Sequence, residues 1–267
     1  MAKVLGESGR NVSDAATQET RKLVHWGCAT VSIVGAVEGF FLASLLPRFS
    51  MPHWLSAGAT LGAAALLIVL SKWGSRKMDE IDRKRMAFRR GADGEYVVGL
   101  ALARLPDDFH VINDLTTPFG NLDHVVIGPT GVYILDTKSW RGVVTADGRG
   151  ELILNGQPLD KPHIRRFVAR TMSIRDRVRA LAPDLDPYFD SVFVFTSAKV
   201  EARWGTTGRV NCIRDEQLHD YIVEKSYGKR LRAEHAQTLA QAFLALARMD
   251  RDFSEHDVSE PERAAAA

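Results

Sequence analysis

Asp123, Asp136 and Lys138 have the residue types and the spacing that hydrolytic chemistry requires. They belong to two segments that are rich in β-branched residues, 122–127 and 132–138, and that flank the turn sequence Gly-Pro-Thr-Gly at 128–131. Such a pattern predicts a β-hairpin. If residues 129 and 130 form its tip, the glycines on either side pair, and counting back along both strands places Asp123 directly opposite Asp136.

Like charges that face each other across two strands destabilise a sheet. We therefore expect a positive group between Asp123 and Asp136, and carboxylate oxygens are ligands that Mg²⁺ and Mn²⁺ prefer. Lys138 is two residues beyond Asp136 and so shares its face of the strand. The three residues favour metal-assisted hydrolysis. The alternative is a solvent-exposed strand face on which Lys138 neutralises an acid, and a bulge would shift the register.

Glu95 is a further candidate acid. Residues 93–105 predict a helix in which Val98, Leu102 and Leu105 recur at helical spacing, and Glu95 falls on the same apolar stripe. A buried acid needs a partner, so Glu95 is expected to point into the domain toward other polar groups. Alternatively, it only favours the positive end of the helix.

The elements that position these residues predict an α/β fold with a mixed central sheet flanked by helices. After the first helix we expect a strand at 109–112, a polar loop up to Gly120, and then the hairpin. The remaining elements are strands at 143–145, 152–154 and 191–196, a helix at 162–181, and helices at about 215–224 and 230–249.

The helix predicted at 162–181 carries two different stripes. Its apolar residues form one, and Arg166, Arg170 and Arg177 lie on the outer side. These arginines could contact backbone phosphates, which position nucleic acid without reading its sequence. An ordinary solvated helix face is the alternative.

Length and composition allow one sizeable domain with an accessory region and exclude a wholly disordered chain of 267 residues. The net charge of +2 carries no information, but basic residues crowd residues 72–90, and such blocks favour anionic lipid or nucleic acid. Cys28 and Cys212 are the two cysteines, so neither a disulfide framework nor a cysteine metal cluster is expected, which fits a reducing compartment.

Two apolar runs, 23–46 and 54–70, predict a transmembrane hairpin. Lysines and arginines precede the first run and follow the second, which places both termini and the large domain in the cytoplasm, at the inner or plasma membrane. Gly35 and Gly39, and likewise Gly58 and Gly62, have GxxxG spacing that would let the helices approach closely. Glu38 within the first run would face the partner helix or be protonated. A buried pair of helices in a soluble protein is the alternative.

Together these patterns predict that the chain has six parts. They are a disordered N-terminus (1–20), a two-helix transmembrane hairpin (21–72), a basic linker (73–90), the catalytic-type domain (91–225), a C-terminal helix (226–253) and a disordered tail (254–267).

The segments Gly91-Ala92-Asp93-Gly94-Glu95 and 121–140 closely resemble the nuclease-related domain known as NERD, which is placed in the PD-(D/E)XK nuclease-like superfamily. The resemblance covers roughly residues 88–205. It implies that Glu95, Asp123, Asp136 and Lys138 are the catalytic residues, and that Glu95, Asp123 and Asp136, with the Thr137 carbonyl, are the metal ligands.

This resemblance implies a Mg²⁺-dependent or Mn²⁺-dependent nuclease in which Lys138 orients or helps deprotonate water. The family often carries a glutamine early in the helix after the β region, whereas residues 162–166 here read Pro-His-Ile-Arg-Arg. That departure favours an alternative, a catalytically inactive module that binds nucleic acid or protein. A third hypothesis makes the hairpin the working part and the domain its regulator. The expected partners are nucleic acid, with DNA favoured over RNA, the lipid bilayer, and a second copy of the chain.

Overall fold

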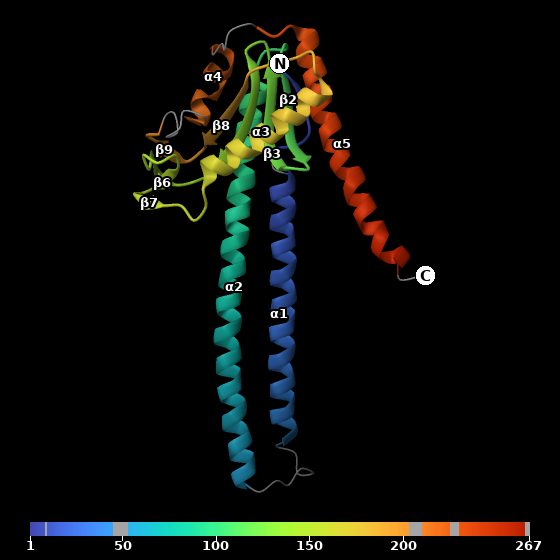
Figure 1. Ribbon diagram of the computed structural model, residues 1–267. Helices are drawn as coiled ribbons and strands as arrows, with labels where there is room; N and C mark the ends of the chain where they lie inside the picture. Colours follow the sequence, from blue (N-terminus) through green and yellow to red (C-terminus); the bar gives the residue numbers. More distant parts are fainter. Residues whose placement is uncertain (9, 45–52, 203–209, 225–229, 265–267) are drawn as a thin grey trace. The chain divides into compact units, whose positions relative to one another are not determined.

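The computed structural model describes residues 1–8, 10–44, 53–202, 210–224 and 230–264, and the chain divides into two compact units. The first unit combines Met1–Asn11 with Arg90–Ala267, and the second is Val12–Arg89. Figure 1 shows the ribbon with the labels used below.

The second unit consists of most of helix α1 (Arg10–Ser44) and the first part of helix α2 (His53–Ala103). Within it the two helices contact each other, because the ring centroids of Trp26 and Trp73 are 5.1 Å apart in an edge-to-face arrangement. A helix was expected in each of the two apolar runs, and both form.

The prediction that these helices cross a membrane is not supported. In the described part of the chain, no helix combines the length and the apolar character that a bilayer crossing needs. α1 begins with polar turns that include Glu19 and Lys22, and α2 continues from its apolar start into charged residues. The runs are also rich in alanine, glycine, serine and threonine, which offer little apolar surface. Most of the predicted connection, 47–52, and the side chain of Glu38 lie outside the described residues.

Two further predictions concern this region. At Gly35, Gly39, Gly58 and Gly62 an added Cβ would meet nothing within 4 Å among the described residues, so the predicted close approach of the helices is not seen there. The expected linker at 73–90 is instead helical within α2. Its charges support the helix, since Glu80 accepts hydrogen bonds from Lys77 at 3.0 Å and Lys84 at 2.8 Å.

The first unit is built on a six-stranded mixed sheet in the order β1-β2-β3-β4-β8-β10. Strands β2, β3 and β4 are antiparallel to one another, whereas β1 pairs with β2, β4 with β8, and β8 with β10 in parallel. The strands are β1 (Lys3–Leu5), β2 (His110–Thr117), β3 (Gly120–Gly128), β4 (Gly131–Lys138), β8 (Phe189–Phe195) and β10 (Asn211–Arg214).

A second, four-stranded sheet has the order β7-β6-β5-β9. Its strands are β5 (Gly142–Ala146), β6 (Leu152–Leu154), β7 (Gln157–Pro158) and β9 (Ala198–Val200). The helices of this unit, besides the end of α2, are α3 (His163–Leu181), the 3₁₀ turn η1 (Asp215–Gln217), α4 (Leu218–Glu224) and α5 (Ala233–Ala264).

Helices cover both faces of the central sheet because its strands alternate between two cores. Val125, Ile134 and Phe193 pack with residues of α3 and α5 on one face. Val126, Leu135 and Val192 pack with the end of α2 and with α4 on the other. Figure 1 shows α3 lying across the sheet. The predicted α/β fold with a mixed central sheet flanked by helices is confirmed.

The structure differs from prediction at several boundaries. β2 continues to Thr117, where a polar loop was expected, because its pairing with β3 extends to Gly120. The N-terminus, expected to be disordered up to residue 20, contains β1 and the start of α1. The tail, expected to be disordered from 254, is helical as far as Ala264.

Candidate active site

The hairpin of β3 and β4 has the register that the sequence predicts. Gly128 pairs with Gly131, and the pairs continue stepwise to His124 and Leu135. One further step places Asp123 opposite Asp136. The backbone N–H of Thr137 donates a hydrogen bond to Asp123 Oδ2 at 2.7 Å, which fixes the carboxylate at the end of β4.

The environment of Asp123 disfavours its ionised form. Burial raises its pKa well above the usual value, and the neighbouring carboxylates of Asp136 and Glu95 raise it further. Lys138 and the Thr137 N–H act in the opposite direction without cancelling these effects. Repulsion among three carboxylates is therefore built into this end of the hairpin.

Lys138 donates a hydrogen bond to Asp136 Oδ1 and forms an ion pair with it. Its ammonium also lies 5.3 Å from the centroid of the Phe193 ring, within cation–π range. Burial lowers the pKa of Lys138, but the charges of Asp136 and Asp123 more than offset this, so the pKa is raised. In this arrangement Lys138 is a cation that donates hydrogen bonds.

Glu95 reaches the same region from the opposite face of the sheet. By strand alternation Asp136 belongs to the face covered by α3 and α5, whereas Glu95 lies on α2, which packs on the other face. Only 5% of the Glu95 surface is exposed, as its place on the apolar stripe predicts. α2 can come close because Gly94 has no side chain: a Cβ there would lie 3.2 Å from Thr196 Oγ1.

The described residues contain no group of three or more histidine, cysteine, aspartate or glutamate side chains arranged to hold a metal ion. Asp123 and Asp136 are brought together, and the charge of Glu95 raises the pKa of Asp123 without completing a cluster. The donors are nonetheless all oxygen atoms. Mg²⁺ commonly uses one or two carboxylates and keeps several waters, so this donor set fits that ion.

The three arginines predicted to contact phosphate are placed differently. Arg170 lies at the site, since its Nη1 donates to the Asn121 carbonyl at 2.9 Å and its charge lowers the pKa of Lys138. Arg166 and Arg177 are exposed on α3.

Sequence reasoning did not single out His163 or Trp140, which border the site. Their ring centroids are 5.1 Å apart. The pKa of His163 is lowered by burial and then by the charge of Lys138. His163 directly follows Pro162 and is the first residue of α3. That position at a helix start is the sequence signal that could have marked His163 as a candidate site residue.

These positions can be compared with known proteins. The model of the family described as NERD, nuclease-related domain, matches residues 90–196. Residues 90–196 therefore resemble a NERD domain. No curated protein and no solved structure matches the chain. The matched residues extend from the end of α2 through β8 and include Glu95, Asp123, Asp136 and Lys138, so the resemblance read from the sequence is supported over that range.

Proposed function

We propose that this protein is a metal-dependent nuclease that hydrolyses phosphodiester bonds of DNA or RNA through its NERD domain. The observation that carries the proposal is the hairpin register, which sets Asp123 opposite Asp136 and places Lys138 beside them. A domain of the nuclease-related family over the same residues supports a nuclease-like function. We also propose that this domain is related to the PD-(D/E)XK superfamily and shares its restriction-endonuclease-like fold.

Asp123 and Asp136 would hold Mg²⁺ or Mn²⁺, with Glu95 contributing directly or through water. When bound, the ion would supply a lowered pKa for water and charge neutralisation at the phosphate. It would also relieve the repulsion that raises the pKa of Asp123.

Lys138 would orient the attacking water and stabilise negative charge on the phosphate oxygens, because its raised pKa keeps it protonated at neutral pH. Arg170 is held by the Asn121 carbonyl and would contact the scissile or an adjacent phosphate. Arg166 and Arg177 would extend that contact along α3 to flanking phosphates.

The test compares the full-length chain with Lys138→Ala on labelled single-stranded and double-stranded DNA and RNA in Mg²⁺ and in Mn²⁺. Loss of a positioned cation that stabilises the developing negative charge should reduce the cleavage rate by about 100-fold or more. Lys199→Ala is the matched control, because Lys199 is an exposed lysine on β9 of the same unit. Equal cleavage by the wild type and Lys138→Ala would refute the proposal.

A second candidate function is a binding module without catalysis. The observations that favour it are the lack of a complete metal-ligand group in the described residues and the pairing of Lys138 with Asp136. In that case nucleic-acid binding would be salt-sensitive and would survive Asp136→Asn, while no metal would support turnover.

A further inference from the structure

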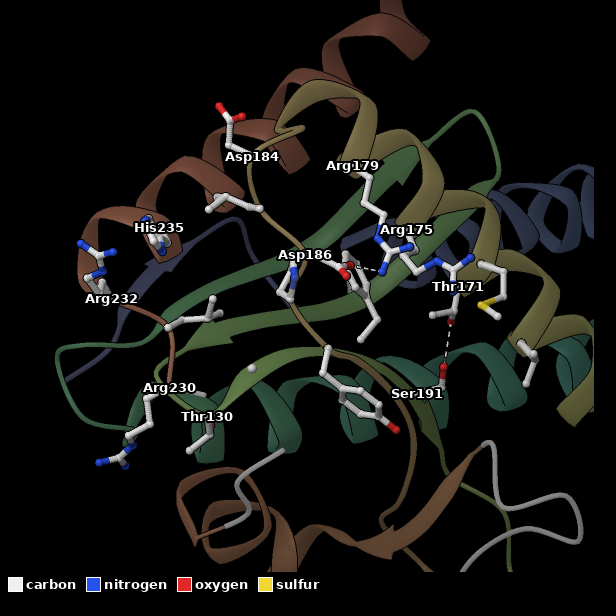
Figure 2. Close-up of a pocket in the computed structure, with 18 residues that line it drawn as sticks. Thr130, Thr171, Arg175, Arg179, Asp184, Asp186, Ser191, Arg230, Arg232 and His235 are labelled. Carbon is white, nitrogen blue, oxygen red and sulfur yellow. Dashed lines mark hydrogen bonds and ion pairs between the residues drawn. The ribbon is translucent and has the colours of Figure 1, made fainter. Parts of the chain in front are cut away.

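The first unit also contains a cavity that none of the acids of the candidate active site lines. This cavity of about 760 Å³ lies where the start of β4, the C-terminal half of α3 and the start of α5 meet. Figure 2 shows the side chains that line it.

Cations dominate the lining of this cavity. Arg175 and Arg179 come from α3, and Arg230 and Arg232 come from the segment before α5, so four arginines stand against two aspartates, Asp184 and Asp186. His235 in the first turn of α5 also lines the cavity. In Figure 2 these side chains come from two separate elements, with Arg175 and Arg179 on one side and Arg230, Arg232 and His235 on the other.

Hydrogen bonds attach the two elements that carry these arginines to the central sheet. Leu231, between Arg230 and Arg232, donates its backbone N–H to the Pro129 carbonyl at the tip of the hairpin, at 3.0 Å. On the α3 side, the hydroxyl of Ser191 on β8 donates to Thr171 Oγ1 at 3.1 Å, and both residues are buried in the cavity lining. These hydrogen bonds connect both sides of the cavity to the central sheet.

The carboxylates that pair with these arginines are weak competitors for a ligand. Arg179 pairs with Asp186, Arg175 with Asp176, and Arg232 with Glu234. The side chains of the three acids are 79%, 63% and 66% exposed, and ion pairs this accessible to solvent contribute little. Arg179 Nε is also buried and has no hydrogen-bond acceptor among the described residues. An anion that offers several oxygen acceptors would therefore gain more from these guanidinium groups than the exposed acids do.

The first turn of α5 also favours the binding of an anion in this cavity. Unpaired backbone N–H groups and the helix dipole make a helix N-terminus favourable for phosphate. α5 runs from Ala233 to Ala264, and Arg232 and His235 at its start line the cavity. Arg175 and Arg179 on α3, together with the arginines and the helix start on the α5 side, give this cavity a positive lining that favours an anion with several oxygens.

We propose that this cavity binds a nucleoside phosphate. Its volume lies in the range of pockets that enclose a small organic ligand, so it can hold more than a single phosphate ion. The arginines would contact the phosphate oxygens, and Tyr188, which lines the cavity and is 51% exposed, offers an aromatic face for a base.

The lining of this cavity does not include Asp123, Asp136 or Lys138. It extends from Gly131 at the start of β4 to Ser191 on β8, which pairs with Ile134, two residues before Asp136, so the two sites are neighbours that share no acid. The proposal does not depend on nuclease activity, and each can fail alone.

The test is isothermal titration of the full-length chain with ATP and, separately, with sodium pyrophosphate, in EDTA and without nucleic acid. We expect one ATP per chain, bound at least about tenfold more weakly by Arg230→Gln/Arg232→Gln. Both arginines are exposed, so this variant should fold, which far-UV circular dichroism checks. Arg104→Gln/Lys199→Gln is the matched control, because it removes the same charge at exposed positions outside the cavity.

Four results are informative. Tighter binding of ATP than of pyrophosphate would show that the nucleoside is also contacted and would support the proposal, whereas equal affinities would overturn its nucleoside part and leave a site for phosphate alone. No saturable binding of either compound up to about 1 mM would overturn the proposal. An unchanged affinity in Arg230→Gln/Arg232→Gln would overturn it as well, since ATP would then bind elsewhere. Arg175→Gln provides an independent check from the α3 side.

Discussion

Replacing Asp123 by asparagine should stabilise the first unit at neutral pH in the absence of a divalent metal. Asp123 stands opposite Asp136, and burial together with the charges of Asp136 and Glu95 raises its pKa. Asparagine has almost the same shape and can still accept the hydrogen bond from the Thr137 N–H. The substitution therefore removes a charge while retaining the local contact.

The magnitude follows from Coulomb's law. Two carboxylates about 5 Å apart, the separation of directly opposed residues, repel by about 3 kcal/mol at an effective dielectric constant of about 20. The attraction between Asp123 and Lys138, at the diagonal distance of about 7 Å, offsets about 2 kcal/mol of this. Glu95 adds repulsion and burial adds a desolvation cost. We expect a net gain of about 1 to 2 kcal/mol.

Amide hydrogen exchange of peptides covering 120–138 measures this gain within the unit concerned. The measurement is made at pH 7 in EDTA on wild type, Asp123→Asn and the control Asp108→Asn, which changes an exposed acid. The advantage of Asp123→Asn should shrink as the pH falls through the raised folded-state pKa, because Asp123 then becomes neutral in the wild type. Added Mg²⁺ should slow exchange in the wild type more than in the variant.

Faster exchange in Asp123→Asn than in the wild type at pH 7, with Asp108→Asn unchanged, would refute this reasoning. It would mean that the ionised carboxylate of Asp123 stabilises the fold. Repulsion between Asp123 and Asp136 could then no longer be the reason to expect a bound cation.

Other substitutions test further parts of the structure. Gly128→Ala should cost about 1 to 3 kcal/mol of stability, measured by urea unfolding, because its Cβ would lie 2.1 Å from the Phe109 ring. His124 is buried with its pKa lowered to about 3, so its contribution to stability is present above pH 6.5 and is lost as the pH falls toward 3. Between pH 7 and pH 5 the wild type should thus lose about 2 kcal/mol more than His124→Gln, and parallel pH profiles would contradict this. Glu95→Gln should lower the pKa of Asp123, measured by carboxyl NMR, and an unchanged value would show that Glu95 lies too far away. Arg170→Ala should weaken nucleic-acid binding and reduce its salt dependence by about one phosphate contact, whereas an unaltered salt slope would exclude such a contact.

The hairpin could be predicted because its information is local. The Gly-Pro-Thr-Gly turn sets the pairing of Gly128 with Gly131, and the period of two along each strand then fixes every opposed pair as far as His124 and Leu135. Glu95 was predicted to be buried because the helical period of its neighbours is similarly local, and it is.

Features that depend on distant segments were not predictable in this way. The pairing of β1 with β2 joins residues 3–5 to 110–112, and nothing in those three residues marks them as a strand. The cavity arginines come from 175–179 and 230–232, which are brought together by the packing of α3 and α5. The approach of His163 to Lys138 likewise requires the start of α3 to lie near the end of β4.

Strand β1 determines which truncated fragments of this protein keep the central sheet complete. Met1–Asn11 belongs to the same unit as Arg90–Ala267, so the helices between them are attached to that unit by both of their ends. A fragment that begins near residue 83 would keep every acid of the candidate active site and still lose β1, leaving the β2 edge of the sheet open to pair with another chain. Deleting the helical segment while joining residue 11 to residue 90 through a flexible linker would preserve that edge strand. The N-terminal residues are best treated as part of the NERD-containing unit, even though the family match begins at residue 90.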